Sequence, residues 1–116
     1  MLDKMNLLST ETFKTYTDTN DCLVVFFKDL CPNCKVLMKV LEKCLVQHSE
    51  LNIAGVNTEE NPDLMEASDV SKVPTVIVYK KGKPVARKSG IMNPTEMMAF
   101  YFNAQAKLWT RTLMLS

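Results

Sequence analysis

The chain has 116 residues, of which 47% are hydrophobic and 23% charged, a length that suits one domain and is too short for two separate cores. Its 14 basic and 13 acidic residues give a net charge of +1 without a basic stripe, which argues against nucleic acid or an anionic membrane as a partner. The sequence therefore predicts a single domain over residues 1–116 that works as a monomer and recognises partners by shape and local chemistry.

The N-terminus gives no targeting signal. Charged side chains interrupt residues 1–19, unlike the apolar segment of a secretory signal. The longest strongly apolar run, residues 23–27, is far shorter than the roughly 20 residues of a membrane-spanning helix. We therefore expect a soluble, cytoplasmic protein, and in that reducing compartment a close cysteine pair is more often catalytic or metal-binding than structural.

The first half of the chain predicts two strands and two helices. Residues 6–8 suit a short strand, and a first helix begins at Ser9. Residues 22–27 form a continuous apolar run of β-branched and aromatic side chains, which is typical of a central strand buried on both faces. From residue 32 to about residue 48, apolar side chains recur at three- and four-residue spacing opposite polar ones, which predicts an amphipathic helix.

The middle of the chain predicts three strands and a short helix. Residues 51–56 suit a strand, and a helix of residues 62–65 follows. Residues 75–79 form a strong strand pattern, joined by a short turn to a more polar strand over residues 84–89, so the two predict an antiparallel hairpin. Pro84 indicates an edge position for the second of them.

The last helix is predicted to begin with a capping box, with Asn93 as the cap, Pro94 at the first helical position and Glu96 able to return a hydrogen bond. It runs past residue 109 and carries an apolar stripe expected to pack in the core, formed by Met98, Tyr101, Phe102, Leu108 and Trp109. The order of all these elements predicts an α/β fold, with a mixed central sheet flanked by helices on both faces.

Cys31 and Cys34 stand where a buried strand passes into the clearest predicted helix. Pro32 falls at the first helical position, where its missing N–H has no partner to lose. Unpaired amide groups and the helix dipole favour a thiolate at the exposed cysteine of this turn, and Cys31 is the better placed. Its thiolate can attack a substrate disulfide, and Cys34 can then attack Cys31 and release the reduced substrate. Asn33 is expected to tune the reduction potential.

A zinc site is an alternative for this pair, since half of a zinc site has the same spacing. Cys22, Cys44 and His48 offer no second close pair, so we expect no metal and no other cofactor. Two incidental cysteines at a helix start are the other alternative. Cys22 and Cys44 suit small buried hydrophobic positions, and His48 is expected to be a solvated residue at a helix end.

Three segments together resemble the thioredoxin family, over nearly the whole chain. Residues 24–35, which include the cysteine pair, resemble the strand that leads into the family's Cys-x-x-Cys helix. Residues 56–62 resemble the segment after the third strand, and residues 73–83 with Gly90 match the proline loop, the hairpin and the following glycine. The resemblance implies a thioredoxin-like fold. Residues 107–116 extend beyond the usual end of the family as a C-terminal helical extension, expected to pack on the body through Trp109, Leu113 and Leu115, with packing on a partner as the alternative.

The resemblance also implies roles for individual residues. Pro74 is expected to follow a cis peptide bond and to face Cys31, the backbone of Val73 to hydrogen-bond an extended substrate, and Gly90 to leave room for that chain. The residues expected to bind substrate are Leu30, Pro32, Val73, Pro74 and Gly90.

Several positions depart from the family pattern. Leu30 replaces a tryptophan, and the proline of the motif comes one place earlier, as in glutaredoxins. Val25 and Gly55 stand in place of a buried aspartate, thought to help deprotonate the resolving cysteine, and its lysine partner. Proton transfer from Cys34 must then use water or another group. The expected substrate face also gains polar side chains at Thr58, Lys72 and Ser89.

The sequence thus predicts a thiol–disulfide oxidoreductase that reduces protein disulfides through Cys31 and Cys34 and is recharged by a thioredoxin reductase. One alternative couples the same pair to glutathione, since Pro32 has its counterpart in glutaredoxins, although the glycine pair that usually lines a glutathione site is not evident. A further alternative is a non-enzymatic binding module that uses the Pro74 face, against which the intact cysteine pair argues.

Overall fold

The computed structural model describes residues 5–115, with side chains described for residues 5–106. Its centre is a five-stranded sheet in the order β1-β3-β2-β4-β5. The strands β1 and β3 run parallel to β2, whereas β4 is antiparallel to β2 and to β5. Their bounds are Asn6–Leu7 for β1, Cys22–Phe27 for β2, Ile53–Asn57 for β3, Thr75–Lys80 for β4 and Lys83–Ser89 for β5. The predicted mixed sheet is confirmed, with β2 at its centre and β5 at an edge.

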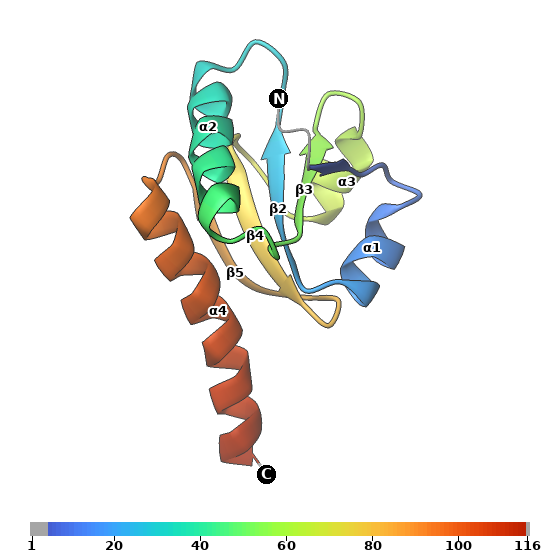
Figure 1. Ribbon diagram of the computed structural model, residues 1–116. Coiled ribbons are helices and arrows are strands. Elements are labelled where there is room, and N and C mark those ends of the chain that lie inside the picture. Colours follow the sequence, from blue (N-terminus) through green and yellow to red (C-terminus); the bar gives the residue numbers. More distant parts are fainter. Residues whose placement is uncertain (1–4, 116) are drawn as a thin grey trace.

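Helices cover both faces of this sheet (Figure 1). The helices α2 (Pro32–Gln47) and α4 (Pro94–Leu115) pack on one face, and α1 (Phe13–Thr19) and α3 (Pro62–Ala67) on the other. The C-terminal part of α4 extends past the sheet (Figure 1). Among the described residues, no helix combines the length and apolar composition that crossing a membrane requires.

The β2 strand explains the continuous apolar run in the sequence, because its two faces belong to two separate cores. Leu23, Val25 and Phe27 join the core under α2 and α4, whereas Val24 and Phe26 join the core under α1 and α3. All of β2 is buried, with Phe27, the most accessible of these residues, only 3% exposed. A strand covered on both faces has no position for a polar side chain, so the usual alternation disappears.

The α4 helix begins with the predicted capping box. The backbone N–H of Asn93 donates to Glu96 Oε1 at 3.1 Å, and the N–H of Glu96 donates to Asn93 Oδ1 at 2.8 Å. Such reciprocal bonds satisfy two amide groups that the helix itself leaves unpaired. The first turn of α4 is thereby fixed close to its packing position on the sheet.

The predicted apolar stripe of α4 is only partly right. Tyr101 is buried and Met98 packs against the core, but Phe102 is 44% exposed. Met97 and Ala104, which the prediction left out, are buried in its place. The buried face is therefore rotated from the predicted one. The structure describes no side chains beyond residue 106, so the expected packing of Leu108, Trp109, Leu113 and Leu115 stays a prediction.

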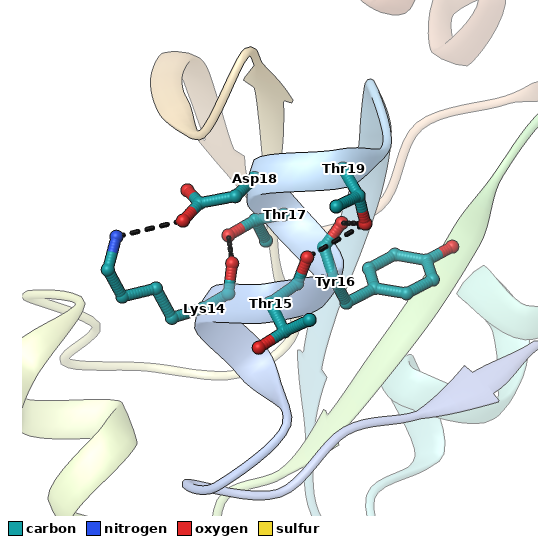
Figure 2. Close-up of polar contacts among 6 residues, drawn as sticks. All are labelled: Lys14, Thr15, Tyr16, Thr17, Asp18 and Thr19. Carbon is teal, nitrogen blue, oxygen red and sulfur yellow. Dashed lines mark hydrogen bonds and ion pairs between the residues drawn. The ribbon is translucent and has the colours of Figure 1, made fainter.

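The α1 helix depends on packing, because three of its seven residues are threonine, a weak helix former. The hydroxyls of Thr17 and Thr19 donate to backbone carbonyls one turn back, and Lys14 forms an exposed ion pair with Asp18 at 2.9 Å (Figure 2). Exposed pairs of this kind contribute little stability. The ring of Phe13, by contrast, packs on aromatic rings of β2 and β4, with centroids 6.4 and 5.4 Å apart.

Candidate active site

Cys31 and Cys34 form a disulfide at the start of α2, with their Cα atoms 5.2 Å apart. Cys31 is the N-cap residue, in an extended conformation, and Pro32 opens the helix as predicted. The backbone N–H of Cys34 donates to Cys31 Sγ at 3.2 Å. An amide of the first turn thus points at the Cys31 sulfur, an arrangement that favours a thiolate on Cys31 once the disulfide is opened.

The disulfide is more enclosed than expected. Cys31 is 7% exposed and Cys34 is 4% exposed, and both belong to the core under α2 and α4. The expectation of an exposed Cys31 is therefore wrong for this oxidised form. The residues around the pair are open to solvent, since Pro32 and Asn33 are exposed and Leu30 is 91% exposed. The φ angle of Leu30 is 54°, a left-handed conformation uncommon for residues other than glycine.

Pro74 lies at the same end of the sheet as the disulfide. Phe26 of β2 pairs with Thr75 of β4, which places the start of β4 beside the end of β2. The Val73–Pro74 peptide bond is cis, as the family resemblance implies. Val73 is half-buried whereas Pro74 is buried.

Hydrogen bonds fix this proline loop to the edge strand β5. Thr75 Oγ1 donates to the carbonyl of Lys72 at 2.6 Å and lies 2.8 Å from Ser89 Oγ. The N–H of Gly90 donates to the carbonyl of Pro74 at 2.9 Å. Gly90 has a φ of 94°, and a Cβ atom built on it would meet no atom within 4 Å. The space beside Gly90 is therefore open.

A cavity of about 370 Å³, here called the disulfide cavity, borders both cysteines. It lies between the loop that follows β2 and one face of α2. Val73, Pro74 and Gly90 do not line it, so it is separate from the proline loop. Its lining consists of Phe27, Lys28, Asp29, Leu30, Cys31, Cys34, Lys35, Met38, Lys39 and Glu42.

The buried region next to the site is apolar at both positions where the family pattern has a charged pair. Val25 is fully buried, and a Cβ atom on Gly55 would lie 2.8 Å from the sulfur of Met5 and 3.0 Å from the ring of Phe27. Met5 thus fills the space that a side chain at residue 55 would need. Sequence reasoning missed Met5, because nothing in its neighbourhood along the chain indicates this contact. Residues 25 and 55 cannot accept a proton from Cys34.

Thr58 and Glu59 support the loop before Cys31. Thr58 was predicted for the substrate face but is 6% exposed, and its N–H and hydroxyl both donate to the carbonyl of Phe27, at 2.8 and 3.0 Å. The carboxylate of Glu59 accepts a hydrogen bond from the N–H of Asp29 at 2.9 Å. Thr58 and Glu59 therefore fix where β2 ends and its loop begins. Lys72 and Ser89 are exposed.

His48 differs from its expectation as a simply solvated residue. Its side chain is 32% exposed, with Nδ1 3.5 Å from Glu50 Oε1 and the ring edge-on to Phe102 at 5.3 Å. These contacts keep it at the junction of α2 and α4, away from the disulfide. Among the described residues, no group of three or more His, Cys, Asp or Glu could hold a metal ion.

Cys22 and Cys44 are free thiols and are buried, as predicted. Burial raises the pKa of Cys22 to about 12, with a smaller contribution from the charge of Asp21. Burial also raises the pKa of Cys44. Because the thiolate is the reactive form, both are poor nucleophiles near neutral pH.

Alkylation should therefore distinguish the two kinds of cysteine. At pH 8, iodoacetamide should leave the folded oxidised protein unmodified, because its only free thiols, among the described residues, are protonated and buried. After reduction, we expect Cys31 to react first. Peptide mass spectrometry identifies the labelled residue, and a denatured sample, in which all four cysteines label, is the control. Rapid labelling of Cys22 in folded protein would contradict the burial described here.

Comparison with known proteins agrees with this geometry. The family model for thioredoxin matches residues 4–102. Thioredoxin of Chlamydia caviae is 33% identical over 94 residues, which cover 81% of this chain and 92% of that protein. Thioredoxin-2 of Saccharomyces cerevisiae is 34% identical over 86 residues, covering 72% and 83%. The solved structure of reduced desulfothioredoxin from Desulfovibrio vulgaris Hildenborough is 34% identical, with a TM-score of 0.76, and the match covers 88% of this chain and 99% of that one.

Proposed function

The chain belongs to the thioredoxin family and is a thiol–disulfide oxidoreductase, and we propose that it reduces protein disulfides with Cys31 as the nucleophile and Cys34 as the resolving cysteine. The hydrogen bond from the N–H of Cys34 to Cys31 Sγ is the observation that carries this assignment. It makes Cys31 the sulfur that is better stabilised as a thiolate.

In the proposed reaction, the Cys31 thiolate attacks one sulfur of a substrate disulfide. A mixed disulfide forms, and the other substrate sulfur leaves as a thiolate. Cys34 then loses its proton and attacks Cys31 Sγ, which restores the disulfide and releases the second substrate thiolate. Two electrons pass from the dithiol to the substrate. Because Cys34 is enclosed and residues 25 and 55 carry no base, its proton leaves through water on the cavity side.

We propose that an extended substrate segment lies along the proline loop. The half-buried backbone of Val73 beside Pro74 supplies hydrogen-bonding groups, and the open space at Gly90 accommodates the approaching chain. Leu30, which is almost fully exposed, offers an apolar contact next to the disulfide, as does Pro32, which is also exposed. Asn33 is proposed to tune the potential through its place between the two cysteines.

The partners follow from this chemistry. We propose that the chain acts as a monomer, as one domain over residues 1–116 with residues 107–116 as a helical extension, and that a thioredoxin reductase recharges it. We place its activity in the cytoplasm, a reducing compartment in which a close cysteine pair is more often catalytic than structural.

Insulin reduction tests the proposed function. With NADPH and a thioredoxin reductase as the electron source, the protein should sustain reduction of the insulin disulfides, whereas a Cys31→Ser variant should be inactive. The equilibrium potential of the cysteine pair, measured against glutathione, should lie near about −270 mV for a reductant of this type. No turnover with either the reductase or glutathione as the electron source would overturn the proposal, and a binding module would then be the better description.

A further inference from the structure

The disulfide cavity gives the cysteine pair a second access route, apart from the proline loop. Both cysteines line it, whereas Pro74 and Gly90 do not. Its volume of about 370 Å³ falls in the range of sites for small molecules, roughly 300–1,000 Å³, and is too small for a folded partner. A small molecule in this cavity would lie directly against the disulfide.

Charged side chains of both signs line the cavity, with cations in excess. Lys28, Lys35 and Lys39 contribute three ammonium groups, and Asp29 and Glu42 contribute two carboxylates. The ion pair of a lysine with a carboxylate among the described side chains lies elsewhere, within α1, so these lysines form none with a described residue. The cavity therefore offers unpaired positive charge to a ligand that carries more negative groups than positive ones.

The remaining lining is apolar. Phe27, Leu30 and Met38 contribute aromatic, aliphatic and thioether surface beside the sulfur atoms. An apolar lining with a few charged groups at defined places is typical of sites that bind small ligands with a fixed orientation. The lysines themselves are exposed, so their attraction for an anionic ligand is screened by salt and is strongest at low ionic strength.

We propose that the disulfide cavity binds a low-molecular-weight thiol that carries two carboxylates and one ammonium group, the class to which glutathione belongs, and that this thiol reduces the Cys31–Cys34 disulfide directly. The lysines receive the carboxylates, and Asp29 or Glu42 receives the ammonium group. The inference rests on the proposed function, because it supplies electrons to the same cysteine pair by a route other than a reductase.

The reaction takes two equivalents of the small thiol. The first thiolate attacks Cys31 Sγ, which forms a mixed disulfide and breaks the Cys31–Cys34 bond, and Cys34 leaves as a thiolate and takes a proton from water. The second thiolate attacks the sulfur of the bound small molecule, which releases Cys31 as a thiolate and forms the small-molecule disulfide. The protein gains two electrons, and two small thiols are oxidised.

The test compares a charged thiol with a neutral one. Oxidised full-length protein is mixed with glutathione or with 2-mercaptoethanol, and acid quenching followed by alkylation gives the rate constant for reduction of the disulfide. Corrected for the thiolate fraction of each reagent, we expect glutathione to react about tenfold faster at low salt. A Lys35→Glu/Lys39→Glu variant should lose about tenfold in rate with glutathione and change less than about twofold with 2-mercaptoethanol.

A matched variant controls for net charge. Lys43→Glu/Lys83→Glu changes the charge by the same amount at exposed positions outside the cavity, so both rate constants should stay within about twofold of those of the unchanged protein. S-methylglutathione, which has no free thiol, should compete with glutathione.

Three outcomes would overturn the inference: equal corrected rates with the two thiols, an equal loss with both thiols in the cavity variant, or no competition by S-methylglutathione. Single-turnover reduction of insulin by pre-reduced protein separates this inference from the proposed function. Insulin reduction together with any of these three outcomes removes the cavity site alone, whereas absence of insulin reduction counts against the proposed function.

Discussion

A Cys34→Ser variant should accumulate as a mixed disulfide with its substrate through Cys31. In the unchanged protein, Cys34 lies one turn from Cys31, so the second attack is intramolecular and needs no encounter. Removing that sulfur leaves only external thiols to resolve the adduct, and turnover should fall by about a thousandfold or more. Non-reducing gels and mass spectrometry of the variant, mixed with insulin, measure the adduct.

The matched control is Cys31→Ser, in which Cys34 is the remaining sulfur of the pair. This variant should form little adduct, because the first-turn N–H that favours a thiolate is directed at the sulfur of residue 31 and not at that of Cys34. Equal trapping by both variants would contradict the assigned roles, and stronger trapping by Cys31→Ser would reverse them. The buried thiols of Cys22 and Cys44 are present in both variants, so they cannot explain a difference between the two.

The sequence predicted the elements whose pattern depends on burial or on signals that act within a few residues. The β2 strand matches its predicted bounds, because a strand covered on both faces requires an unbroken apolar run. The α2 helix and the start of α4 were also predicted, since the proline at the first helical position and the capping box act within a few residues.

Features that depend on tertiary contacts could not be predicted in the same way. The first helix begins at Phe13 rather than at Ser9, because residues 9–12 form a turn that positions the Phe13 ring on the sheet. The buried face of α4 is centred on Met97. The predicted stripe missed it because two neighbouring faces of that helix are both apolar enough to suit the core. Thr58 is buried because its hydroxyl has a carbonyl partner on a strand 31 residues away in sequence.

The candidate site also has a part that the sequence predicted and a part that it could not predict. The cysteine pair could be found from spacing and from its place at a helix start, and Pro74 from the family resemblance. The disulfide cavity could not, because Lys35, Met38 and Lys39 have the spacing of any amphipathic helix face, and only the position of the preceding loop turns that face into a cavity.

Restoring an acidic side chain with a Val25→Asp substitution should destabilise the protein strongly and in a pH-dependent way. Residue 25 is fully buried in the sheet, where its described strand partners, Val76 and Gly55, carry no charge that could pair with a carboxylate. Desolvation should raise the pKa of the new carboxyl above its ordinary value of about 3.9. We expect the free energy of unfolding at pH 7 to fall by about 3 kcal/mol or more.

The sign of the pH dependence follows from that raised pKa. Below about pH 3.9 the carboxyl is neutral in both states, whereas above it the unfolded state ionises first, so stability falls by up to about 1.4 kcal/mol per pH unit until the folded-state pKa is reached. A Val25→Asn variant has a similar shape and no charge, so urea unfolding of both variants from pH 4 to pH 8 isolates the ionisation. A constant difference between the two would contradict this account.

Adding Gly55→Lys should not rescue the Asp variant while Met5 is present, because the new Cβ would lie 2.8 Å from the Met5 sulfur. A Met5→Ala substitution in the same chain should make room for the lysine and recover part of the lost stability, since the buried carboxylate would then have a partner.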